Sequence, residues 1–94
     1  MYYTYVLLCS DNRTYIGASN NLKERIERHN KGYIAATHKR LPVKLLAYFA
    51  FSDEHIAFSF EQYLKSGSGR AFMKKHIFYS NSDGKIPLKS TTQL

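Results

Sequence analysis

The N-terminal part of this sequence contains two short runs rich in tyrosine and branched apolar residues, at positions 2–10 and 14–18. Asp11 and Asn12 end the first run, and both residue types are typical of tight turns. Two such runs joined by a short turn indicate a β-hairpin. The hairpin constrains the fold strongly, because side chains alternate between the faces of a strand and opposed residues share a face.

The length of the connection decides which face Tyr15 occupies. A two-residue loop would place Tyr15 on the other face from Tyr5. A three-residue connection over residues 11–13, with Asn12 in the left-handed region, would place Tyr15 opposite Cys9. We predict this odd-length connection, which brings four side chains onto one face: Tyr3, Tyr5, Cys9 and Tyr15.

A helix is predicted over residues 21–31. Ser19 and Asn20 can supply oxygens for its N-cap, and Gly32 can end it. Its apolar side is predicted to consist of Leu22, Ile26 and Tyr33.

Two basic side chains of this helix are expected to face the sheet. At ~100° per residue, Arg25 and His29 lie on the same side as Leu22. They can belong to a functional site or simply form the polar edge of the helix, and their spacing alone does not decide between the two.

The next two elements are a third strand and a second helix. The strand is predicted over residues 43–51, after Pro42, and Ser52 can cap a helix over residues 53–65. Glu61 is placed at the margin of the buried side of that helix, where a single glutamate is more often a surface residue than a ligand. The buried stripe is predicted to be Ile56, Phe60, Tyr63 and Leu64.

The stretch Ser66-Gly67-Ser68-Gly69 can end the second helix and start a third. Its apolar residues are Phe72, Met73, His76 and Ile77, whereas Arg70, Lys74 and Lys75 point outward. This outward face can bind phosphates or be an ordinary solvated surface. The free backbone amides of the Ser-Gly stretch can also bind an anion. Residues 80–94 are polar and lack periodicity, so we expect a domain over residues 1–79 followed by a flexible tail.

Charge and cysteine content narrow the class of partner and the compartment. The 94 residues include 14 Lys and Arg against 7 Asp and Glu, a formal net charge of +7. This balance favours a polyanion such as nucleic acid as the partner. Cys9 is the only cysteine, so the chain forms neither an internal disulfide nor a thiolate cluster around a metal. No apolar stretch approaches the ~20 residues of a membrane helix, and we expect a soluble, cytoplasmic protein.

The order of the candidate residues resembles a known nuclease motif. The triplet Tyr-Ile-Gly at 15–17 is followed by Arg25 and, one helical turn later, by His29. This pattern resembles the second half of the GIY-YIG endonuclease motif, and the resemblance continues through Glu61 over most of the chain. The triplet at 3–5, Tyr-Thr-Tyr, lacks the leading glycine and the isoleucine but keeps the final tyrosine. It is similar to that of small free-standing bacterial members, which resemble the N-terminal domain of UvrC.

The resemblance implies a fold and an activity. The expected fold is α+β, a small three-stranded antiparallel sheet flanked by helices, and the expected activity is metal-dependent hydrolysis of DNA phosphodiester bonds. One site in so small a chain favours nicking of one strand, or dimerisation if both strands are cut, so monomer and homodimer stay open. The DNA is expected to be branched or damaged, as in DNA repair, and recognised loosely or by shape.

The resemblance also assigns roles to individual residues. Tyr5 matches the tyrosine thought to act as the base, and Tyr15 matches the one that binds the phosphate or water. Arg25 can hold the scissile phosphate through its fixed fork of donors. His29 is expected to orient Tyr5 or assist proton transfer. Glu61 offers an oxygen ligand that suits Mg²⁺ or Mn²⁺.

Further contacts to DNA are expected from basic residues around the site and from one glycine: Gly17, Lys39, Arg40, Lys65, Arg70 and Lys74. Two alternatives stay open. One is a nucleic-acid-binding module of the same fold with little or no catalysis. The other is a basic RNA-associated protein that stacks bases on Tyr2, Tyr3 and Tyr5.

Overall fold

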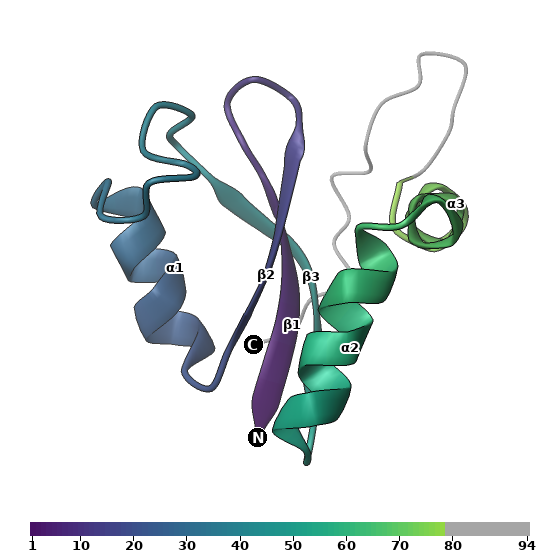
Figure 1. Ribbon diagram of the computed structural model, residues 1–94. Helices are drawn as coiled ribbons and strands as arrows, with labels where there is room; N and C mark the ends of the chain where they lie inside the picture. The colour runs from purple at the N-terminus through teal and green to yellow at the C-terminus, as the bar shows by residue number, and fades with distance from the viewer. Residues whose placement is uncertain (79–94) are drawn as a thin grey trace.

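The computed structural model describes residues 1–78 of the 94-residue chain, so the predicted tail over residues 80–94 lies outside the described part. At the centre is a three-stranded antiparallel sheet with the strand order β2-β1-β3 (Figure 1). The strands are β1 Tyr2–Leu8, β2 Thr14–Ser19 and β3 Lys44–Phe51. β2 is therefore an edge strand, hydrogen-bonded to β1 alone in this sheet.

The helices are α1 Leu22–Asn30, α2 Glu54–Leu64 and α3 Gly67–His76. α1 lies on one side of the sheet, and α2 and α3 lie on the other (Figure 1). The predicted α+β class and three-stranded sheet are confirmed. Each side of the sheet has its own apolar core, Tyr5, Leu7, Cys9, Leu22 and Val43 on the α1 side and Val6, Ile16, Leu64 and Met73 on the other.

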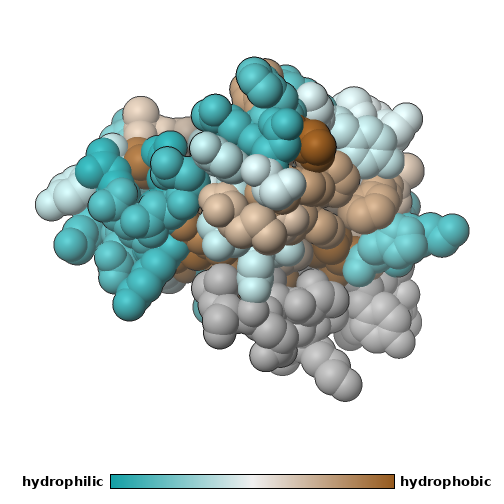
Figure 2. All heavy atoms as spheres, turned by 90° about the horizontal axis from the view of Figure 1, so that it is seen from below, coloured by the Kyte–Doolittle hydropathy of each residue, from teal (hydrophilic) through white to brown (hydrophobic). Residues whose placement is uncertain are grey.

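The outer surface of the molecule differs from one side to the other. Seen from below, hydrophilic side chains gather on the side where α1 lies, whereas apolar side chains show in the middle of the view (Figure 2). No helix within residues 1–78 combines the length and the apolar character that a membrane span needs.

The hairpin has the predicted odd-length connection, placed one residue earlier. The backbone N–H of Asn12 donates to the carbonyl of Cys9 over 3.0 Å, and Asn12 has φ 64°. These are the features of a three-residue loop, a turn followed by one left-handed residue. Because the loop covers residues 10–12 rather than 11–13, Tyr15 lies opposite Leu7 instead of Cys9. The shift is two residues in register, so Tyr15 still shares the face of Tyr5.

The N-caps of α1 and α2 each lie one residue after the predicted position. The side chain of Asn21 accepts a hydrogen bond from the backbone N–H of Glu24 over 3.2 Å, and that of Asp53 accepts one from His55 over 2.7 Å. Neighbouring residues of equal capping ability compete at both sites, and only the backbone geometry selects one. The sequence prediction was wrong on both caps, which it assigned to Ser19-Asn20 and Ser52.

α2 presents a line of small and medium side chains to the sheet. Ala57 and Leu64 are buried, and the hydroxyl of Thr4 on β1 donates to the carbonyl of Ala57 over 2.7 Å. Glu61 lies between them on the same line, and its side chain is only 12% exposed. With intermediate burial between two buried residues, Glu61 lies at the margin of the inward face of α2, where the sequence placed it. The hydrogen bond from Thr4 holds the helix that carries this carboxylate against the strand that carries Tyr5.

Three large apolar side chains that the pattern placed inside are exposed: Tyr33 by 63%, Ile56 by 52% and Tyr63 by 40%. Gly32, with φ 80°, ends α1 before Tyr33, whose ring lies under the Arg28 guanidinium at 5.6 Å. In α2 the approach of Ala57 to the sheet turns the larger residues away. His76, also predicted on an apolar face, is exposed as well.

Candidate active site

The phenol of Tyr5 lies at the centre of the candidate site. Tyr5 is in the middle strand and is 1% exposed, and its hydroxyl is 2.9 Å from Nε2 of His29. Gly17 pairs with Tyr5 across the strands, and a Cβ added at Gly17 would lie 2.5 Å from the Tyr5 hydroxyl. The glycine of the second triplet is therefore needed because the ring of Tyr5 crosses it, toward the free edge of β2.

His29 is held from both ring nitrogens. Its Nδ1 is 2.7 Å from Oγ1 of Thr37, in the segment between α1 and β3, and both residues are fully buried. Nothing in the sequence singles out Thr37, because its spacing does not distinguish it from other polar loop residues. Tyr5, His29 and Thr37 form one buried chain of hydrogen bonds.

The surroundings of Tyr5 and His29 determine which of these two side chains carries the shared proton. Burial, and then the charge of Tyr15, raise the pKa of Tyr5 far above its ordinary value, although Arg25 acts in the opposite direction. Burial, and then Arg25, lower the pKa of His29, which is therefore neutral at pH 7. Because the phenol keeps its proton, the geometry favours donation from Tyr5 to Nε2. The Nδ1 hydrogen then points at Thr37.

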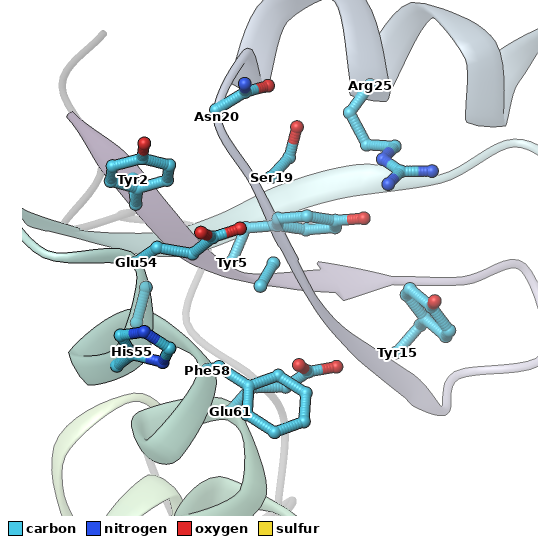
Figure 3. A pocket seen from close by; sticks show the side chains of 12 residues that line it. Tyr2, Tyr5, Tyr15, Ser19, Asn20, Arg25, Glu54, His55, Phe58 and Glu61 are labelled. Carbon is cyan, nitrogen blue, oxygen red and sulfur yellow. The ribbon is translucent and has the colours of Figure 1, made fainter.

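Two further predicted residues flank the Tyr5 hydroxyl. Arg25 precedes His29 by one turn of α1 and is partly buried. The ring of Tyr15 contacts both Tyr5, at a centroid distance of 6.3 Å, and His29, at 5.2 Å. The guanidinium and the two phenols lie around one opening (Figure 3).

Glu61 reaches the same opening from the other side of the sheet. Tyr5, Tyr15, Arg25 and Glu61 all line one cleft with a volume of about 810 Å³. His29 lies behind Tyr5 and does not line the cleft. The structure thus brings residues from four elements together, although α1 and α2 cover opposite faces.

Of the two carboxylates that line the cleft, Glu54 and Glu61, the candidate metal ligand is Glu61. Within residues 1–78, no group of three or more His, Cys, Asp and Glu side chains is arranged to hold a metal ion. Glu61 Oε2 accepts a hydrogen bond from the Lys65 ammonium over 2.9 Å. A single, mostly buried carboxylate suits Mg²⁺, which commonly takes one or two protein carboxylates and keeps several waters. The donor set therefore fits a hydrated divalent ion.

The residues predicted to contact DNA do not form one patch. Lys39 is exposed, and Arg40 is paired with Asp11 through an Nε–Oδ2 distance of 2.7 Å. Arg70 and Lys74 are exposed on α3, on the far side of the sheet from α1 (Figure 1). Gly17 lies beneath Tyr5. The remaining member, Lys65, is bound to Glu61 at the cleft.

The alternative with a three-tyrosine stacking platform does not match the structure. Tyr5 is buried, and Tyr3 packs against Tyr48 with a centroid distance of 6.0 Å. Tyr2 precedes Tyr3 on β1, so its side chain starts from the opposite face of the strand. These three rings present no common exposed surface.

Comparisons with known proteins give a family. The family model described as the GIY-YIG catalytic domain matches residues 1–76. The chain is 42% identical over 88 residues to a UPF0213 protein of Pediococcus acidilactici, covering 90% of this chain and 86% of the relative. It is 48% identical over 65 residues to a UPF0213 protein of Lacticaseibacillus paracasei, covering 68% and 73%. A solution NMR structure of a UPF0213 protein from Bacillus halodurans is similar in fold, with a TM-score of 0.50 and 29% identity over 80% of this chain and 84% of that chain.

Proposed function

Because this chain belongs to the GIY-YIG family of catalytic domains, we propose that it is an endonuclease that hydrolyses DNA phosphodiester bonds with the help of Mg²⁺ or Mn²⁺. One observation carries the proposal. Tyr5, Tyr15, Arg25 and Glu61 are distant in the sequence and line a single cleft. Two phenols, a guanidinium and a carboxylate in one cleft match the requirements of phosphodiester hydrolysis: a proton acceptor, charge for the phosphoryl oxygens and a metal ligand.

Arg25 positions the phosphate in this proposal. Its planar fork can hold two phosphoryl oxygens at once, and its charge compensates the negative charge that develops on them. Tyr15 lies next to this position and can donate its hydroxyl hydrogen to the phosphate or the attacking water. Glu61 would hold the divalent ion, whose positive charge stabilises the leaving oxygen.

Tyr5 and His29 move the proton of the attacking water. The Tyr5 pKa is far too high for a free phenolate at neutral pH. Tyr5 therefore takes the water proton on its oxygen while passing its own proton to Nε2 of His29, at 2.9 Å. The resulting imidazolium has both ring hydrogens satisfied, one by Tyr5 and one by Thr37. His29 is the final proton acceptor, and Tyr5 is the relay that reaches the cleft.

The test is cleavage of supercoiled plasmid and of branched DNA with Mg²⁺ or Mn²⁺. We expect conversion to open circles, one nick at a time, and loss of about 100-fold or more of this rate in Glu61→Gln, since metal charge contributes several kcal/mol. Glu27→Gln, the same chemical change on the exposed side of α1, is the control and retains the rate. Equal nicking by the parent and Glu61→Gln proteins contradicts the proposal, as does activity that survives a chelator.

A binding module without catalysis is the second candidate, and the ion pair of Lys65 with Glu61 is the observation that favours it. An ammonium 2.9 Å from the carboxylate competes with a metal ion for the same oxygen. In that case the parent protein binds DNA without nicking it, and Lys65→Met, which removes the competing ammonium, gains metal-dependent nicking.

The substrate and the assembly belong to the proposal as well. One candidate active site within residues 1–78 favours nicking by a monomer, and a homodimer would be needed to cut both strands together. Branched or damaged DNA is the proposed substrate, with a role in DNA repair. A cytoplasmic location stays a prediction from the composition.

A further inference from the structure

The cleft extends well beyond the residues assigned to hydrolysis. Tyr2, Asn20, Glu54, His55 and Phe58 line it together with Arg25 and Glu61. On α2, Glu54, Phe58 and Glu61 occur at helical spacing along one side, and seven residues of helix span about 10 Å. The view into the cleft shows Arg25 and Tyr15 toward one end and Tyr2 and His55 toward the other (Figure 3).

The two ends of the cleft differ in charge. Arg25 makes one end suitable for a phosphate, whereas Glu54 places a carboxylate at the other. A second phosphate would be repelled by Glu54. A neutral group with hydrogen-bond donors suits that end, and the exocyclic amino groups of cytosine, adenine and guanine are such donors.

Among residues 1–78, the aromatic side chain of Phe58, between Glu54 and Glu61 on α2, lines the cleft without contacting another ring (Figure 3). Phe58 is 57% exposed. Within residues 1–78, Phe49, Phe51, Phe60 and Phe72 each contact another ring, whereas the rings of Phe58 and Tyr2 do not. Exposed rings are the usual platform on which unpaired bases stack. The fixed charges that line this cleft are one guanidinium, Arg25, and two carboxylates, Glu54 and Glu61.

We propose that this end of the cleft binds an unpaired nucleobase of the strand whose phosphate is held by Arg25. Phe58 stacks on the base, and Glu54 accepts a hydrogen bond from its amino group. A base inside a duplex cannot enter, because its faces are covered by its neighbours and its amino group is paired. The substrate class that follows is DNA with a single-stranded or unpaired nucleotide next to the cleavage position. This inference rests on the proposed function for the role of Arg25.

The test measures binding without turnover, in Glu61→Gln protein. The probes are a single-stranded oligonucleotide with one 2-aminopurine and the same strand in a duplex. We expect tighter binding of the single strand, with quenching of 2-aminopurine on stacking, and about tenfold weaker binding with loss of quenching in Phe58→Ala. Ile56→Ala is the matched control, since Ile56 is also exposed on α2, by 52%, and does not line the cleft.

Two outcomes overturn the inference. One is equal affinity of the Phe58→Ala and Ile56→Ala proteins for the single strand. The other is binding of the duplex as tight as that of the single strand. Neither outcome depends on nicking, so an inactive parent protein would refute the proposed nuclease and leave the base site supported by its own measurements. Circular dichroism of each variant confirms that the fold is retained.

Discussion

At the scale of single residues, two buried hydrogen bonds, to Tyr5 and to Thr37, fix the position of the His29 ring. Thr37 is the only hydrogen-bond partner of Nδ1 within the described residues. It does not reach the cleft, so its proposed role is positioning: it fixes the ring and the tautomer that leave Nε2 free to accept from Tyr5.

Replacing Thr37 with valine keeps the side-chain volume and removes the oxygen. The unsatisfied Nδ1 hydrogen should lower the free energy of unfolding by about 1–3 kcal/mol. We expect kcat for nicking to fall roughly tenfold, part of the ~10²–10⁴ that a positioned base supplies. Thr37→Ser, which restores the oxygen, should recover the rate. Destabilisation with an unchanged kcat and an unchanged acid limb of the pH–rate profile would show that Thr37 is structural only.

The lowered pKa of His29 gives the protein a pH dependence with a definite sign. In the unfolded chain the imidazole titrates near its ordinary ~6.5, and the folded pKa lies below that. Between the two values the unfolded state binds more protons, so stability rises with pH up to about 6.5 and is lost as the pH falls. The slope contributed by His29 is at most ~1.4 kcal/mol per pH unit.

Urea unfolding at a series of pH values between 5 and 8 measures this slope. The control is the His29→Gln protein, in which the contribution of the imidazole should vanish. Stability that increases on acidification through this range in the parent, and not in the variant, would contradict the assignment of a neutral buried imidazole.

At the scale of elements, the packing of α3 on α2 depends on one glycine. A Cβ added at Gly69 would overlap the carbonyl of Tyr63 and the backbone of Leu64, whereas one added at Gly67 would meet nothing within 4 Å. Gly69→Ala should therefore lower the free energy of unfolding by about 1–3 kcal/mol. Gly67→Ala should leave stability unchanged or raise it by up to ~1 kcal/mol. Thermal unfolding of the Gly69→Ala and Gly67→Ala proteins measures this difference. Equal stabilities would mean that the two helices can move apart at little cost in free energy.

The elements also show what a sequence can and cannot predict. The odd-length loop was predictable from Asn12, because few residue types tolerate a left-handed backbone conformation. The family was predictable from the order of Tyr15, Arg25 and His29. The inward face of α2 was not predictable from hydrophobicity. It is set by the small Ala57 and by a hydrogen bond from Thr4, a contact between residues 53 positions apart. Such long-range polar contacts leave no periodic signal.

The candidate site was predictable from the sequence only in part. The motif predicted Tyr5, Tyr15, Arg25 and Glu61 by type and spacing, and the structure places them around one cleft. Thr37 and Phe58 were not predicted as site residues. Thr37 is an ordinary polar residue of a loop, and Phe58 is an ordinary apolar residue of a helix. Only the three-dimensional neighbours of these two side chains distinguish them.

At the scale of the whole molecule, the net charge of +7 should appear as salt-dependent binding to DNA. If about five basic groups contact phosphates, the logarithm of the binding constant should fall with the logarithm of salt concentration at a slope near −4.5. The basic side chains are not equivalent in this respect. Arg40 is already paired with Asp11 at 2.7 Å, whereas Arg25 faces the cleft without a carboxylate hydrogen bond among residues 1–78.

Single substitutions of arginine test which positive charges contact DNA phosphates. Arg25→Gln should reduce the magnitude of the slope by about 0.9, the contribution of one phosphate contact. Arg40→Gln should change it less, because Asp11 already neutralises that guanidinium in the free protein. Fluorescence anisotropy of labelled DNA without divalent metal measures each slope. A slope near zero in the parent protein would show that its positive charges do not contribute to binding DNA. A larger loss for Arg40→Gln than for Arg25→Gln would place the DNA path along the α1–β3 connection instead of the cleft.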